Sequence, residues 1–132
     1  MTLMDAPVRI VRVSVDARDQ LIRLKRYTGI TQWNILCRWA LCRSLAEPTP
    51  PSPAPLPAMS NVEMSWSVFA GPYSALFILL LKQRCLEEKR GVDEATLADQ
   101  LRLHLHRGIA TLATRETRAV EDVVRLGLLA PG

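Results

Sequence analysis

The hydrophobic positions of residues 31–47 surround nearly the whole circumference of a predicted helix. Ile35, Trp39, Cys42 and Ala46 follow one line, at successive spacings of four, three and four residues. The other apolar residues of the segment cover most of the remaining directions: Trp33, Leu36, Cys37, Ala40, Leu41 and Leu45. A helix that is apolar nearly all round is buried on several sides. One small chain cannot supply that much cover, so the pattern predicts a homo-oligomer.

A short strand and a first helix precede this segment. Residues 8–15, VRIVRVSV, alternate with a period of two and place the later valines on one face, which predicts a strand with one buried face. Asp16 is the expected N-cap of a helix that continues to about Thr28. Gly29 follows it and can adopt the positive φ that commonly ends a helix.

The first part of the chain therefore has the outline of a ribbon–helix–helix module, over residues 8–47. Thr31 is expected to cap the second helix, and Pro48 closes it. In that architecture the strands of two chains pair into a ribbon that enters the DNA major groove, and the N-terminus of the second helix faces a phosphate. An edge strand without any role in DNA binding is the alternative.

The rest of the chain is predicted to be a proline-rich strap at 48–59, a helical half at 60–113 and a tail at 114–132, all within one domain of 1–132. The strap consists of PTPPSPAPLPA followed by Met59. Its prolines favour an extended polyproline conformation. The fold class is thus mainly α with one short N-terminal β-strand, in which the ribbon–helix–helix-like module is followed by a further helical bundle.

Capping signals set the expected helices of the second half. Ser60 and Glu63 match a capping box, which predicts a short helix from Ser60 through Phe69. A second helix is expected from Pro72 to about Arg90, and Asp93 is expected to cap a third. The leucine stripe of this third helix continues to residue 112, and one more amphipathic helix is expected at 116–126.

The positive charge of the chain is concentrated in its first third. The whole chain has a net charge of +4. Residues 1–47 hold eight basic and four acidic side chains, whereas residues 48–132 hold nine of each. A basic module joined to a neutral one is typical of an anion-binding surface, although a solvated basic face is the plainer interpretation.

Few residues offer catalytic or metal-binding chemistry. The three cysteines lack metal-site spacing, and their odd number favours reduced thiols in the cytosol. His104 and His106 are two residues apart on a predicted helix, so they point in nearly opposite directions and cannot share a metal ion. No glycine-rich phosphate loop, signal peptide or membrane-spanning run is present in the sequence. We expect a cytoplasmic protein that is not an enzyme and needs neither cofactor nor metal.

Four sequence blocks resemble the DndE family of the bacterial machinery for DNA sulfur modification, or phosphorothioation. They are NILCRWALCRSLAEPTPP, SNVEMSW, LLKQR and LRLHLHRGI, within a resemblance that extends from about Val8 to about Leu112. The tail after Ala113 lies outside it. The resemblance implies a homotetrameric subunit that binds duplex DNA and prefers nicked duplex. It also implies that the chemistry belongs to partner proteins: a cysteine desulfurase, an iron–sulfur protein and an ATPase.

The basic surface of the family is lysine-rich, whereas arginine supplies fourteen of the seventeen positive charges in this chain. The planar guanidinium group suits bidentate phosphate contacts. The candidate DNA-contacting residues all lie in the first module: Arg9, Arg12, Arg18, Arg23, Lys25, Arg26 and Thr31. Two alternatives stay open, namely a protein–protein scaffold in the same complex and a ribbon–helix–helix transcriptional regulator. For His104, a hydrogen-bonded structural role is favoured over a phosphate-contacting or docking role.

Overall fold

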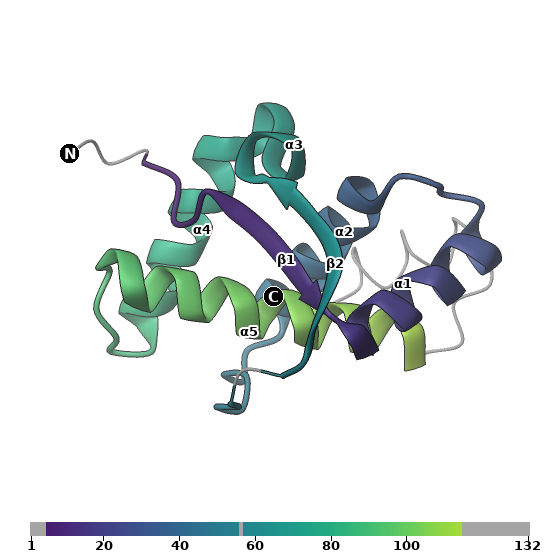
Figure 1. Cartoon of the computed structure of the whole chain (residues 1–132). Coiled ribbons are helices and arrows are strands. Elements are labelled where there is room, and N and C mark those ends of the chain that lie inside the picture. The colour runs from purple at the N-terminus through teal and green to yellow at the C-terminus, as the bar shows by residue number, and fades with distance from the viewer. Residues whose placement is uncertain (1–4, 56, 115–132) are drawn as a thin grey trace.

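The computed structural model describes residues 5–55 and 57–114. Figure 1 shows the longest helix, α5 (Glu94–Thr114), extending along the molecule, with α4 (Ser74–Glu87) near one end and α1 (Val15–Thr28) near the other. Buried side chains of the N-terminal strand and of the helices pack into a hydrophobic core around α5. The chain is therefore mainly helical, as the sequence predicts.

A two-stranded antiparallel sheet joins the two halves of the chain. β1 (Ile10–Ser14) pairs with β2 (Met59–Ser65), so that Arg12 lies opposite Glu63. The alternation is confirmed from Ile10 to Val13, because Val11 and Val13 are buried while Ile10 and Arg12 are exposed. It does not continue to residue 15, because Ser14 is buried as well and Val15 begins α1. The ribbon–helix–helix interpretation, in which β1 pairs with a second chain, is not confirmed: β2 of the same chain occupies one edge of β1.

The helix predicted from the Ser60–Glu63 capping box is wrong. Those residues belong to β2, and the Ser60 hydroxyl donates to the Val13 carbonyl oxygen at 2.8 Å instead of capping a helix. The short helix α3 (Trp66–Ala70) begins later, with Ser65 as its N-cap. Pairing with the exposed edge of β1 outweighs the local capping signal, since it satisfies the backbone groups of the whole segment.

Helix α1 begins two residues earlier than the sequence predicts. Its N-cap is Ser14, whose Oγ accepts from the Ala17 N–H at 3.0 Å, so Asp16 lies in the first turn and is not the cap. Gly29 ends the helix with φ of 77°, as predicted. The buried face of the helix consists of Ala17, Leu21, Leu24 and Thr28.

Helix α2 (Trp33–Ala46) packs against α5 over its length. The two helices approach so closely that a Cβ built on Gly108 would lie 1.8 Å from the Ala40 carbonyl oxygen. Glycine at this position is therefore required by the packing of α2 on α5. The opposite side of α2, which includes Ile35, Trp39 and Cys42, is only partly buried within the chain.

The helix predicted from Pro72 is divided in two. A 3₁₀ turn, η1 (Gly71–Tyr73), precedes α4, which ends at Glu87. The leucine stripe predicted for the third helix of the second half is buried in α5. Asp93 caps that helix by accepting from the Thr96 N–H at 3.1 Å. The additional helix predicted at 116–126 lies outside the described residues.

The described part of the proline-rich strap before Met59 forms neither helix nor strand, and arginines of α5 hold it in place, whereas Met59 itself begins β2. Arg107 donates to the Thr49 carbonyl oxygen at 2.7 Å, and Arg102 donates to that of Ala54 at 3.0 Å. The strap thereby returns the chain from the end of α2 to β2. Within the described ranges, none of the helices is both long and apolar enough to cross a membrane.

Candidate nucleic-acid interface

Four of the seven candidate DNA-contacting residues lie on α1. Because the buried face of that helix points into the core, its basic side chains must project outward: Arg18, Arg23, Lys25 and Arg26. Arg23 and Arg26 are exposed and form no ion pair with any residue that the structure describes. Their guanidinium groups are therefore available to an external anion.

Lys25 and Arg18 are more restrained than these two arginines. The Lys25 ammonium lies 3.5 Å from the centroid of the Trp33 ring, in cation–π geometry. This contact connects α1 to the first residue of α2 and orients the ammonium without neutralising it. Arg18 forms an exposed ion pair with Asp19 at 3.1 Å. Exposed pairs of this kind contribute at most about 1 kcal/mol, so an incoming phosphate can compete for Arg18.

Arg12 projects away from the core as the sequence predicts, but its charge is matched across the sheet. Its Nη2 and Nε atoms both donate to Oε2 of Glu63, at 2.6 and 3.1 Å. The pair is about half exposed. Arg9 lies just before β1 and is exposed. The sheet thus offers less free positive charge than α1.

Thr31 does not cap α2, which corrects the sequence prediction. The N-cap is Gln32, and its side chain makes no capping hydrogen bond. Thr31 is exposed in the loop that joins α1 to α2. It remains close in sequence to the uncapped start of α2, where backbone N–H groups and the helix dipole favour negative charge.

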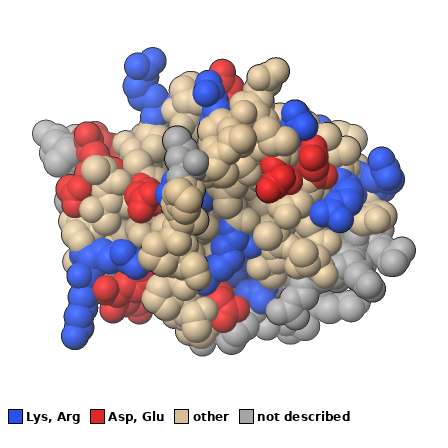
Figure 2. Space-filling model, turned by 60° about the horizontal axis from the view of Figure 1, so that its bottom comes forward, with Lys and Arg blue, Asp and Glu red and all other residues tan. Residues whose placement is uncertain are grey.

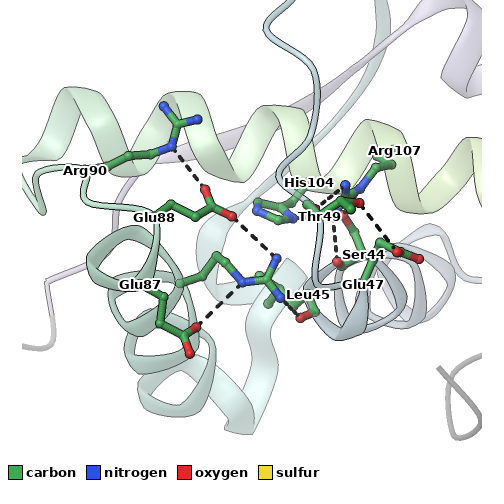
Figure 3. Close-up of polar contacts among 10 residues, drawn as sticks. Ser44, Leu45, Glu47, Thr49, Glu87, Glu88, Arg90, His104 and Arg107 are labelled. Carbon is green, nitrogen blue, oxygen red and sulfur yellow. Dashed lines mark hydrogen bonds and ion pairs between the residues drawn. The ribbon is translucent and has the colours of Figure 1, made fainter. Parts of the chain in front are cut away.

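The surface charges are mixed on the face shown in Figure 2, where basic side chains alternate with acidic ones and no single continuous basic patch forms. Anion binding therefore depends less on the number of basic side chains than on which of them lack a carboxylate partner. Among the described residues of the second half of the chain, Arg84, Arg90, Arg102 and Arg107 all form contacts within the chain, and Figure 3 shows the group of contacts around His104.

This group connects α2, α4 and α5 through polar contacts, several of them buried, that the sequence did not reveal. The members are Ser44, Glu47, Arg84, Glu87, Glu88, Arg90, His104 and Arg107. Arg43, which Figure 3 does not label, joins them through its ion pair with Glu47. Arg84 lies near Glu88 at 3.6 Å and also donates to the Leu45 carbonyl oxygen. Arg107 donates to the hydroxyl and the carbonyl oxygen of Ser44, both at 2.9 Å. These arginines stabilise helix packing.

His104 lies at the centre of this group and is fully buried. Its Nδ1 is 2.8 Å from the Ser44 hydroxyl, which already accepts from Arg107 and can therefore donate to the imidazole. Burial, followed by the positive charges of Arg107 and Arg84, lowers the pKa of His104 from 6.5 to about 3. The ring is therefore neutral near pH 7, and the structural interpretation of His104 is favoured.

His106 has a structural position as well. Its Nε2 accepts from the Ser14 N–H at 3.0 Å, and its Nδ1 lies 2.7 Å from the Arg102 carbonyl oxygen. Burial lowers its pKa from 6.5. The neutral imidazole thereby connects α5 to the junction of β1 and α1, at the N-terminal end of the helix that carries the basic side chains.

The cysteines are not placed as reactive thiolates. Burial raises the pKa of Cys37 to about 12 and also raises those of Cys42 and Cys85. A thiolate is the nucleophilic and metal-binding form, so these thiols are poorly reactive at neutral pH. Within residues 5–55 and 57–114, no three His, Cys, Asp or Glu side chains gather as a metal site would require.

Comparison with protein families identifies a match. The model of the family described as DNA sulphur modification protein DndE matches residues 10–119. The chain belongs to the DndE family. The match continues several residues beyond the point where the sequence resemblance was placed, so part of the tail after Ala113 belongs to the family region too. DndE membership gives the chain a role in DNA sulfur modification. No curated protein matches it significantly.

Proposed function

We propose that this DndE-family chain is a non-catalytic subunit that binds duplex DNA through the exposed side of α1, as part of a homo-oligomer. The supporting observation is the availability of Arg23 and Arg26, which are exposed and unpaired within the described residues. Lys25, oriented by Trp33, adds a third charge on the same helix. Phosphate oxygens are the acceptors that guanidinium groups bind best at such a surface.

The preference for nicked duplex is part of the proposal and rests on the family resemblance. The remaining steps of sulfur modification are assigned to a cysteine desulfurase, an iron–sulfur protein and an ATPase. The raised thiol pKa values support a non-catalytic role. The closeness of Ser44 and His104 does not argue against it, because both side chains are buried where no substrate reaches them.

A scaffold that joins other proteins of the system is the second candidate. Exposed apolar side chains on α4, among them Leu76 and Leu86, favour a protein contact on that side of the molecule. A scaffold has no need of the charges on α1. The two functions therefore differ in their affinity for DNA without any partner protein.

Titration of a fluorescent duplex with the purified protein tests the proposal. The logarithm of the affinity should fall linearly with the logarithm of salt concentration, with a slope of about −0.9 for each phosphate contacted. The same duplex with one central nick should bind more tightly at every salt concentration. Absence of binding even at low salt would contradict the DNA-binding function and favour the scaffold.

A further inference from the structure

Helix α4 presents a row of apolar side chains to solvent. Leu76, Leu79 and Leu86 are 51%, 49% and 64% exposed, and Gln83 lies between them on the same side. The spacings of three, four and three residues are those of alternating a and d positions in a coiled coil. Single exposed leucines are common on protein surfaces, but a helical row of them marks a contact surface.

A groove between α2 and α4 continues this row. It has a volume of about 330 Å³ and is lined by Ile35, Trp39 and Cys42 of α2 on one side. Tyr73 and Leu76 line the other side, so that Leu76 belongs to both the groove and the row. The sequence predicts that another subunit covers part of α2. The partly buried side of α2 therefore faces the same way as the exposed leucines of α4.

We propose that α4 of a second copy of this chain covers the row, antiparallel to the first and related to it by a two-fold axis. An axis placed midway between Leu79 and Gln83 brings Leu76 opposite Leu86 of the other copy. It also brings Leu79 opposite Gln83 of the other copy, which is the pairing of a with d positions in antiparallel coiled coils. The row itself contains no charged residue, and Arg38, which also lines the adjoining groove, donates to the Phe69 and Val68 carbonyl oxygens. Two copies can therefore meet through the row without burying a charge that lacks partners.

This inference rests on the homo-oligomer of the proposed function and adds the surface that forms it. Figure 1 shows α4 and α1 toward opposite ends of α5. Association through α4 therefore leaves the basic side of α1 uncovered in both copies. Each pair of chains then offers two DNA-contacting helices, which increases avidity on a single duplex.

Three variants test the antiparallel pairing by light scattering and sedimentation. Leu76→Glu alone and Leu86→Lys alone each put a charge opposite a leucine and should weaken association by about 100-fold. The double variant L76E/L86K places each glutamate opposite a lysine of the other copy and should restore association. The two positions are ten residues apart, too far for an ion pair within one helix. Ile22→Glu, at a residue of α1 that is 42% exposed, is the matched control.

Each outcome decides a separate point. Dissociation of both single variants to the 14.8 kDa monomer, with recovery in the double variant, supports the proposal. Single variants that keep the wild-type mass would overturn the α4 surface while leaving the oligomer intact. Dissociation without recovery would overturn the antiparallel pairing. A wild-type protein that is monomeric at all concentrations would overturn both this surface and the oligomer, and would assign the row to a different partner. Circular dichroism identifies any variant that fails to fold, and Leu79→Glu then replaces it.

Discussion

At the residue scale, His104 shows how a side chain that suggests chemistry can serve packing. The sequence placed it on a helix and favoured a structural role, but it could not identify Ser44 and Arg107 as its partners. Those contacts join residues about sixty positions apart in the chain. Long-range polar contacts depend on how helices pack, and helical periodicity alone does not determine them.

The depressed pKa of His104 makes stability depend on pH. The folded protein resists protonation of this imidazole down to about pH 3, whereas the unfolded chain binds the proton near pH 6.5. The stabilising contribution is therefore complete above pH 6.5 and declines as pH falls toward 3. We expect urea unfolding to give a free energy lower by about 2 kcal/mol at pH 5 than at pH 7 from this group.

His104→Gln provides the comparison for that measurement. The variant lacks the titrating group and should lose less stability between pH 7 and pH 5 than the wild type does, although it is less stable at pH 7. Any decline left in the variant is attributed to His106 and to carboxylates. Equal declines in both proteins would show that His104 is not the group responsible.

Because Glu63 pairs with Arg12, we predict that removing the Glu63 carboxylate strengthens DNA binding. Glu63→Gln removes the carboxylate and leaves the Arg12 guanidinium available to phosphate. Stability should change by no more than about 1 kcal/mol, because the pair is exposed. Affinity for duplex DNA should rise and the salt slope should steepen, measured by anisotropy. Unchanged affinity would place the sheet outside the DNA-contacting surface.

At the element scale, hydrophobic periodicity predicted β1, α1, α2 and α5 well, because their buried faces are set by residues near one another in sequence. The capping box at Ser60 failed for the converse reason. Its serine and glutamate match a local motif, but β1 lies beside the segment in space and offers backbone partners. A strand whose partner is fifty residues away leaves no clear signal when its own alternation is weak.

The contact between α2 and α5 leads to a prediction at Gly108. Gly108→Ala would normally favour a helix by up to about 1 kcal/mol. Here the added methyl group meets the Ala40 carbonyl oxygen, a backbone atom that cannot move alone. We expect a net loss of about 1–3 kcal/mol in unfolding free energy, measured by urea titration.

Gly29→Ala is the control for this measurement. Its Cβ would meet nothing within 4 Å, and its cost of about 1 kcal/mol arises only from the positive φ. A Gly108 variant as stable as the wild type would contradict the close approach of α2 and α5.

At the scale of the whole molecule, the chain separates its two proposed contacts. Arg23 and Arg26, which form no ion pair within the described residues, lie on α1, and the exposed leucines lie on α4, toward the other end of α5. The concentration of positive charge in residues 1–47 was evident from the sequence. The sequence could not show which arginines form internal contacts, and that distinction is why we propose α1 as the DNA-contacting surface.

Salt-dependent affinity shows whether Arg23 and Arg26 bind DNA phosphates, as we propose. Arg26→Gln and the double variant R23Q/R26Q are compared with Lys89→Asn, which removes one exposed charge near α4 and tolerates the φ of 59° at that position. We expect salt slopes that are flatter by about 0.9 for Arg26→Gln and by about twice that for the double variant. The losses should be similar for unrelated DNA sequences, and Lys89→Asn should behave as the wild type does. A flatter slope for Lys89→Asn, with wild-type slopes for both α1 variants, would show that Arg23 and Arg26 do not contact the phosphates.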